Sequence, residues 1–176
     1  MVLLTACAAS SGQYTAAQET ALTAPDKPGQ EMLIKNTLIA VNHGVITGNY
    51  TVLRDLGTEE FRRNNSAAAL AATFDKLRTQ SIDLSPILVT PAEIVAARLD
   101  HDTRQLHYTG FFATRPQAVV YSLTFREISG GWMIHKIVVN LQPTDVVISA
   151  AQKYPRHSPS RGSVPVSPVS QTAVRR

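Results

Sequence analysis

Six side chains of this sequence are of the types that carry acid–base chemistry in small enzymes. One carboxylate, two histidines and three tyrosines could supply a general base and its hydrogen-bonding partner, namely Asp83, His107, His135, Tyr50, Tyr108 and Tyr121. Such a base needs a pKa tuned by burial and therefore belongs in a cavity. Tyr108 and Tyr121 fall on the apolar sides of adjacent predicted strands, and His135 lies among apolar residues of the next strand. These positions define a candidate pocket of Tyr50, Tyr108, Tyr121 and His135.

A structural role explains the same residues more simply. Buried tyrosines are ordinary core residues whose hydroxyl reaches a polar partner. Asp83 suits the turn before Pro86, and His107 alternates away from the apolar side of its strand, so we expect His107 to be exposed. His101, Asp102 and His107 could suggest a metal site. They are spread over a turn and the strand that follows it, and they do not supply three ligands that clearly lie together, which argues against a metal site.

The motifs of the common cofactor-dependent and hydrolytic enzymes are missing from the sequence. It contains no nucleotide-binding glycine loop, no HExxH, no CxxC and no Gly-x-Ser-x-Gly. Its single cysteine, Cys7, excludes a disulfide within the chain and a cysteine-rich metal site. We therefore expect no cofactor and no metal, and we lean against an enzyme.

The positive charge of the chain belongs to its C-terminal end. Residues 151–176 carry five of the 17 Lys and Arg residues and no acid, a charge of +5. Residues 1–150 carry the other 12 cations and all 13 acids, a charge of −1. No basic face of a folded domain is evident, so we expect no nucleic-acid partner. The basic tail is also rich in proline and serine, and it is predicted to be disordered from about residue 152.

Four antiparallel strands are predicted in the second half of the chain, joined by short polar or glycine-containing turns. They cover residues 93–99, 106–113, 118–127 and 132–141. The third strand alternates more polar residues with an apolar set, as a half-buried strand does, formed by Val119, Tyr121, Leu123 and Phe125. The last strand carries apolar residues at both parities, so it could be covered on both faces, and its register stays open.

Three helices are predicted before the sheet, over residues 30–47, 50–56 and 66–80. The first has one apolar face with +4, +3, +4 spacing, formed by Ile34, Leu38, Val41 and Val45. Thr58 can cap a turn that follows the second helix, and the alanine-rich third is predicted to be continuous. Helices followed by strands indicate an α+β fold, with three N-terminal helices packed on one face of a curved four-stranded antiparallel sheet.

The first residues of the chain suggest a cellular location. Leu4-Thr5-Ala6-Cys7 resembles the lipobox of bacterial lipoproteins, in which the cysteine thiol receives a diacylglycerol. Three residues precede it, too few for a signal peptide, so we expect the true start to lie upstream. Residues 8–29 are then a flexible tether with an r.m.s. reach of roughly 25 Å. The resemblance implies a lipid anchor on Cys7 at the periplasmic side of the bacterial envelope, with the outer membrane favoured. A free thiol in a cytoplasmic protein is the alternative.

The order of elements over residues 30–141 resembles the nuclear transport factor 2-like superfamily, which has a cystatin-like, cone-shaped α+β fold. Gly48-Asn49-Tyr50-Thr51-Val52-Leu53 is similar to the corner between its first two helices, and Gly130-Gly131-Trp132-Met133-Ile134 is similar to its last hairpin. Phe111-Phe112-Ala113-Thr114-Arg115-Pro116 is similar to uncharacterised secreted bacterial members. The resemblance implies a cavity between sheet and helices. Because the superfamily includes isomerases, dehydratases, transport factors, secretion-system subunits and inactive proteins, the resemblance does not define a function.

Three regions follow from these observations. They are a lipobox-like start and tether at residues 1–29, a cone-shaped domain at residues 30–142 and a C-terminal extension at residues 143–176. We expect a non-enzymatic envelope lipoprotein domain that binds a small apolar ligand or a protein partner. A structural subunit of a bacterial envelope or secretion assembly, and a small cofactor-free isomerase or dehydratase, are the alternatives. The ligand, the partner and the oligomeric state stay open.

Overall fold

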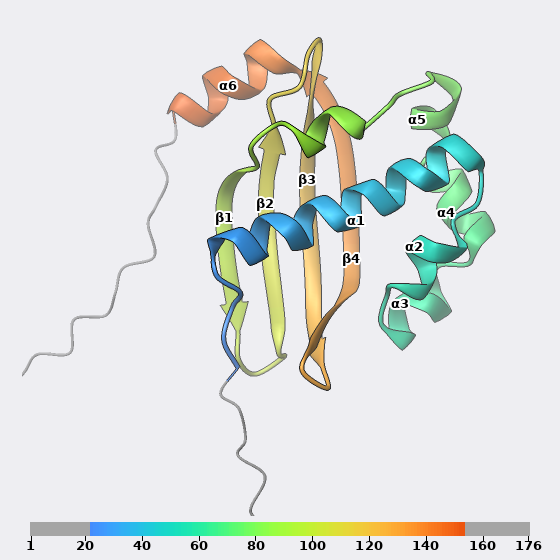
Figure 1. Ribbon diagram of the computed structural model, residues 1–176, viewed down its shortest axis with the longest axis vertical. Coiled ribbons are helices and arrows are strands. Elements are labelled where there is room, and N and C mark those ends of the chain that lie inside the picture. Colours follow the sequence, from blue (N-terminus) through green and yellow to red (C-terminus); the bar gives the residue numbers. More distant parts are fainter. Residues whose placement is uncertain (1–21, 154–176) are drawn as a thin grey trace, which may run out of the picture.

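A four-stranded antiparallel sheet in the order β1-β2-β3-β4 is the centre of the fold (Figure 1). The structure is a computed structural model that describes residues 22–153. The strands cover Glu93–Asp100 (β1), Gln105–Phe112 (β2), Gln117–Ile128 (β3) and Gly131–Pro143 (β4). The predicted α+β class and the four consecutive antiparallel strands are confirmed, with each strand boundary within two residues of its predicted place.

The two faces of the sheet differ in composition, as alternation predicts. The inner face, which is turned toward the first helix, carries large buried side chains from the two central strands: Leu106, Tyr108, Phe112, Val119, Tyr121, Leu123 and Phe125. The outer face carries a mixed set that includes Thr109, Phe111, Ser122 and Thr124. The main core therefore lies on one side of the sheet.

A β-bulge at His135 explains the ambiguous pattern of the last strand. Thr124 pairs with Lys136 while the next residue of β3, Phe125, pairs with Ile134, so His135 is the extra residue. A bulge of this kind reverses the parity of the strand beyond it. Before the bulge the inner face takes Trp132 and Ile134, and after it the inner face takes Ile137, Val139 and Leu141. The apolar residues at both parities thus belong to one covered face, and His135 does not share it with Ile137.

The first helix, α1 (Lys27–Thr47), lies across the inner face of the sheet (Figure 1). Ile34, Leu38 and Val41 are fully buried, and this confirms the predicted apolar face. The helix begins three residues earlier than predicted because Asp26 caps it, accepting a hydrogen bond from the Gly29 N–H at 2.9 Å. Pro28 occupies the first turn, where a missing N–H costs nothing. Residues 27–29 therefore belong to α1 and not to the predicted tether.

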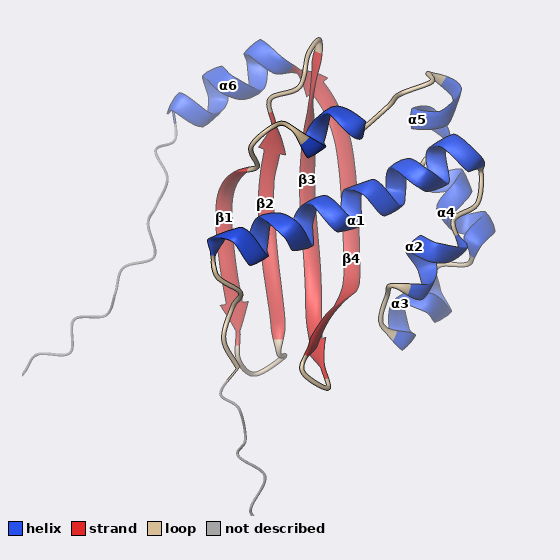
Figure 2. Ribbon diagram, in the orientation of Figure 1, coloured by secondary structure: helices blue, strands red, loops and turns tan. Residues whose placement is uncertain are grey.

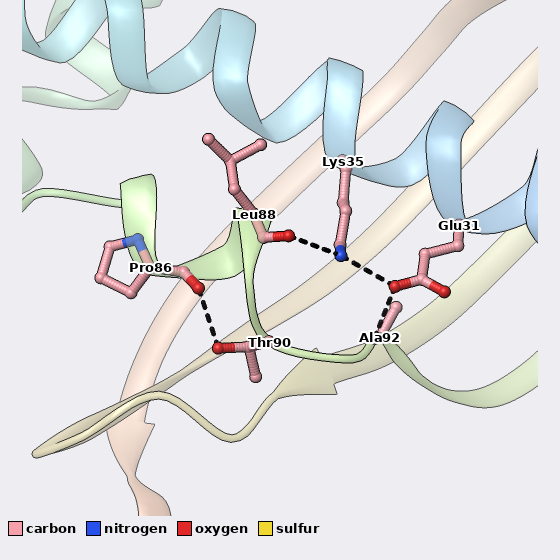
Figure 3. Close-up of polar contacts among 6 residues, drawn as sticks. All are labelled: Glu31, Lys35, Pro86, Leu88, Thr90 and Ala92. Atoms are coloured by element: carbon pink, nitrogen blue, oxygen red, sulfur yellow. Dashed lines mark hydrogen bonds and ion pairs between the residues drawn. The ribbon is translucent and has the colours of Figure 1, made fainter.

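Polar contacts fasten the start of α1 to the connection that leads into β1 (Figure 3). Lys35 Nζ donates to the Leu88 carbonyl at 3.0 Å and pairs with Glu31 at 2.8 Å. Glu31 in turn accepts from the Ala92 N–H at 3.4 Å. The hydrogen bond from Lys35 lowers the pKa of the Glu31 carboxyl, against the opposing effect of desolvation. These contacts hold the short 3-10 helix Ser85–Leu88 and the segment after it against α1.

The remaining N-terminal helices differ from prediction in number and in place. Between α1 and β1 there are four α-helices instead of the predicted two: Thr51–Asp55 (α2), Glu59–Asn64 (α3), Ala67–Thr73 (α4) and Asp75–Thr79 (α5). They gather beyond the β4 edge and not on the sheet face (Figure 2). The reason is geometric. A 21-residue helix is roughly 31 Å long, whereas four strands span roughly 14 Å from first to last. α1 crosses the face with the 3-10 helix Ser85–Leu88 beside it, and the short helices pack against its overhanging end.

The predicted helix 66–80 is interrupted at Phe74, which leaves the helical backbone region. Its ring stacks on Tyr50 with centroids 5.9 Å apart. The Tyr50 ring also lies against α1, because a Cβ on Gly44 would stand 2.4 Å from one of its carbons. This packing overrides the helix propensity of the alanine-rich run. The predicted cap at Thr58 is confirmed, since its side chain accepts from the Phe61 N–H at 3.1 Å.

Candidate functional site

A C-terminal helix, α6 (Thr144–Lys153), covers one end of the outer face of the sheet. The sequence predicts an extension at residues 143–176 that is disordered from about residue 152, but Thr144–Lys153 form a helix of ten residues. The helix is anchored at its start, where Thr144 Oγ1 lies 3.1 Å from the Pro116 carbonyl oxygen and 2.5 Å from that of Thr114. The signal was present in the apolar spacing of Val147, Ile148 and Ala151 directly after Pro143.

The contact between α6 and the sheet is a second, small core. Val147 packs with Phe111 and Ala118, and each of these three side chains is at least nine-tenths buried. Ile148 and Ala151 pack against this cluster from the same side of the helix. The helix meets the sheet along this one contact, and the outer face beyond it stays open, with Thr109 and Ser122 exposed.

A cleft of about 700 Å³ lies where α6 leaves the sheet, and we call it the α6 cleft. Its floor is the outer face and its wall is α6. Most of its lining is apolar, including Phe111, Val120, Val138, Val147, Ile148 and Ala151. The rest is mainly neutral and polar, including Thr109, Ser122, Asn140, Gln142 and Gln152, and Glu93 borders it at the start of β1. Small-molecule sites are concave, mostly apolar and of this size.

The predicted pocket tyrosines lie in the main core. Tyr50, Tyr108 and Tyr121 are 1%, 0% and 2% exposed. The Tyr121 hydroxyl donates to the Glu93 carbonyl at 3.4 Å, whereas the hydroxyls of Tyr50 and Tyr108 have no partner among residues 22–153. Burial raises the pKa of each of the three phenols, so all are neutral at ordinary pH. Tyr121 also borders the α6 cleft.

His135 lies elsewhere, at the bulge of β4 beside α3. Its Nδ1 is 3.3 Å from Thr58 Oγ1, which already accepts the Phe61 N–H, so the geometry favours a Thr58 hydroxyl that donates to a neutral imidazole. Burial lowers the pKa of His135, and the nearby Arg126 lowers it further while Glu60 opposes them. The ring lines a small cavity of about 240 Å³ with Phe61 and Phe74.

The four predicted pocket residues are therefore not brought together. Tyr121 borders the α6 cleft, His135 lines the small cavity, and Tyr50 and Tyr108 are core residues. Asp83 takes the structural role foreseen for it, with its carboxylate accepting from the Ser85 N–H at 2.8 Å.

The predicted exposed position of His107 is only partly met, since its ring is half-buried against the Thr124 hydroxyl at 3.1 Å. Within residues 22–153, no group of three or more His, Cys, Asp or Glu side chains is placed to hold a metal ion.

One further expectation, the lipid anchor, concerns the membrane. Cys7 and most of the predicted tether lie outside the described residues, as does the basic tail after Lys153. In the part of the chain that the structure describes, no helix is both long enough and apolar enough to cross a bilayer.

Comparisons of the chain with protein-family models, with curated proteins and with solved structures found no match.

Proposed function

We propose that this chain is a non-catalytic binding domain whose α6 cleft takes a small apolar ligand, and that a lipid on Cys7 anchors it in the bacterial envelope. The fold proposed with it is the cone-shaped type of the nuclear transport factor 2-like superfamily. The observation that carries the binding proposal is the α6 cleft itself, about 700 Å³ with a mainly apolar lining. Ligand binding in a cavity of this kind is favourable because it removes apolar ligand surface from water.

The same geometry argues against a cofactor-free isomerase. That reaction needs a base and a hydrogen-bond donor aimed at one substrate. In the described residues the histidine with a lowered pKa, His135, and the tyrosine nearest the large cleft, Tyr121, line different cavities. Among the described residues, the α6 cleft is bordered by one carboxylate, Glu93, and by no histidine. The Tyr121 hydroxyl at this cleft already donates to the Glu93 main-chain carbonyl at 3.4 Å and is not aimed at a substrate.

A fluorescent apolar probe tests the binding proposal. N-phenyl-1-naphthylamine should bind the full chain saturably, with one site per molecule. Val138→Trp places an indole in the cleft and should weaken binding by about tenfold or more, since it removes most of the buried ligand area. Val146→Trp is the matched control, because Val146 is 58% exposed on α6 and does not line the cleft. Equal loss in both variants, or no saturable binding at all, would contradict the proposal.

Detergent phase partitioning tests the anchor. The chain expressed with its natural upstream sequence in a bacterial host should enter the detergent phase, and Cys7→Ser should remain in the aqueous phase. A diacylated cysteine accounts for this difference because each buried methylene of an acyl chain contributes about 0.8 kcal/mol. If both forms stay in the aqueous phase, Cys7 is not lipidated and the proposed anchoring in the bacterial envelope is contradicted.

A further inference from the structure

A row of basic residues crosses the outer face of the sheet next to the α6 cleft. Strand register places Arg98 of β1 opposite His107, His107 opposite Thr124, and Thr124 opposite Lys136 of β4. Residues in one register row share a face, and the 3.1 Å contact between His107 and Thr124 agrees with this. Arg98 and Lys136 are exposed at the two ends of the row. We call Arg98, His107 and Lys136 the cationic row.

The cationic row lies next to the floor of the cleft, on the side away from α6. The next row on the same face is Thr109, Ser122 and Val138, which is cleft floor. Two residues along a strand separate these rows, a distance of roughly 7 Å. The floor continues in the opposite direction through Phe111 and Val120 toward α6. Apolar surface and positive charge thus follow one another along the strands.

The charges around the cleft are unevenly placed. No ion pair within residues 22–153 engages Arg98 or Lys136, whereas the neighbouring Arg126 pairs with Glu60 at 3.5 Å. Asp100 lies close enough to Arg98 for the guanidinium to contribute to its lowered pKa. The carboxylate that borders the cleft, Glu93, lies in the Phe111 row toward α6. An anionic group would therefore be attracted toward Arg98 and Lys136.

We propose that the ligand of the α6 cleft is a single-chain anionic amphiphile, a free fatty acid. Its alkyl chain lies along Phe111, Val120 and Val138 beside α6, and its carboxylate lies between Arg98 and Lys136. The strand positions of these two residues are roughly 14 Å apart across the sheet, and their long flexible side chains can both reach a group above the middle of the row. This inference rests on the proposed binding function and adds the class and the orientation of the ligand.

Competition against the fluorescent probe tests it. The full chain carrying Cys7→Ser, which has no attached acyl chain, is loaded with N-phenyl-1-naphthylamine. Dodecanoate, dodecan-1-ol and dodecyltrimethylammonium are then added below their micelle-forming concentrations. Dodecanoate should displace the probe at about tenfold lower concentration than the alcohol, because its head group makes charge-assisted contacts. The ammonium compound should be the weakest of the three, and the preference for dodecanoate should shrink as salt is added.

Charge variants show whether the cationic row is responsible. Arg98→Gln with Lys136→Gln should bring the concentration of dodecanoate that displaces the probe to within about twofold of that of dodecan-1-ol. Arg63→Gln with Lys76→Gln removes the same charge from exposed sites on α3 and α5 and should leave the preference intact.

Two results would overturn the inference while leaving the cleft a binding site: equal displacement by all three compounds, or the same loss of preference in both double variants. A third would be probe release by vesicles of anionic phospholipid but not by dodecanoate, since this would assign the surface to a membrane. Absence of probe binding in the unmutated chain contradicts the proposed function itself.

Discussion

Replacing Gly110 with alanine should destabilise the domain by about 2 kcal/mol or more, because the added methyl group has no space between three strands. Gly110 of β2 pairs with Ile94 on one side and with Tyr121 on the other. A Cβ at this position would stand 2.1 Å from the Glu93 carbonyl oxygen and 2.5 Å from the Tyr121 hydroxyl. The first of these atoms is backbone, so rotating a side chain cannot relieve the overlap. β1 therefore has to shift at this point, and the buried Tyr121 ring has to move as well.

Urea unfolding of the full chain measures this effect, and Gly131→Ala is the matched control. Gly131 also lies in a strand, but a Cβ there would have its nearest neighbour at 3.7 Å, an ordinary contact. The control should therefore change the free energy of unfolding by no more than about 0.5 kcal/mol. Because Glu93, Gly110 and Tyr121 all border the α6 cleft, Gly110→Ala should also weaken probe binding. Similar stabilities for the two variants would show that β1 shifts freely at this point.

The part of the fold that sequence analysis predicted is the part that local pattern determines. Alternation of Val119, Tyr121 and Leu123 with smaller or more polar residues located β3, because neighbouring side chains of a strand face opposite ways. The apolar spacing of Ile34, Leu38 and Val41 likewise located the buried face of α1.

The predictions from sequence are wrong where contacts between residues distant in sequence determine the local structure. The helix break at Phe74 depends on its stacking with Tyr50, more than twenty positions away. The parity change at His135 depends on how β4 pairs with β3. Likewise the short helices lie beyond the sheet because α1 is longer than the sheet is wide, a comparison of two elements that neither shows alone.

The candidate site was missed for two different reasons. α6 had a readable signal, because Val147, Ile148 and Ala151 follow Pro143 at helical spacing, and the proximity of a basic, proline-rich tail obscured it. The cationic row had no such signal. Arg98, His107 and Lys136 lie on three strands and become neighbours only through the register of the sheet. The net charge of the domain does not reveal these basic residues, because its acidic residues offset their charge.

Replacing Asn42 with leucine should cost about 2–3 kcal/mol of unfolding free energy, since buried polar groups would lose their partner. Asn42 lies on α1 and is 1% exposed. Its side-chain Nδ2 donates to Asp83 Oδ1 and to Ser85 Oγ, each at 3.1 Å. Its Oδ1 accepts from the buried Leu84 N–H at 2.9 Å. One amide thus joins α1 to the segment that leads toward β1, and leucine would leave the Leu84 N–H unsatisfied.

The exposed Asn36 on the same helix supplies the matched control. Asn36→Leu makes the same chemical change at a position that faces water, so it leaves no buried polar group without a partner. It should alter the unfolding free energy by no more than about 0.5 kcal/mol. Equal losses at the two positions would show that leucine acts through the helix itself and not through the buried hydrogen bonds.

Asn42→Asp separates the hydrogen bonds from packing, because it keeps the shape and places a second carboxylate against Asp83. In the unmodified chain, hydrogen bonds from Ser85 and then from Asn42 lower the pKa of Asp83 below its usual 3.8. That contribution to stability is present above about pH 4 and is lost as the pH falls through the lowered pKa. Two adjacent carboxylates behave oppositely, since their repulsion raises one pKa above its unfolded value and the folded state then gains stability as the pH falls through that pKa.

Asn42→Asp should therefore be less stable than Asn42→Leu at about pH 7, and it should recover stability relative to Asn42→Leu by about pH 4.5. Urea midpoints at the two pH values measure this, with Asn36→Asp as the exposed control. A gap between the two Asn42 variants that does not change with pH would mean that the introduced carboxylate does not face Asp83.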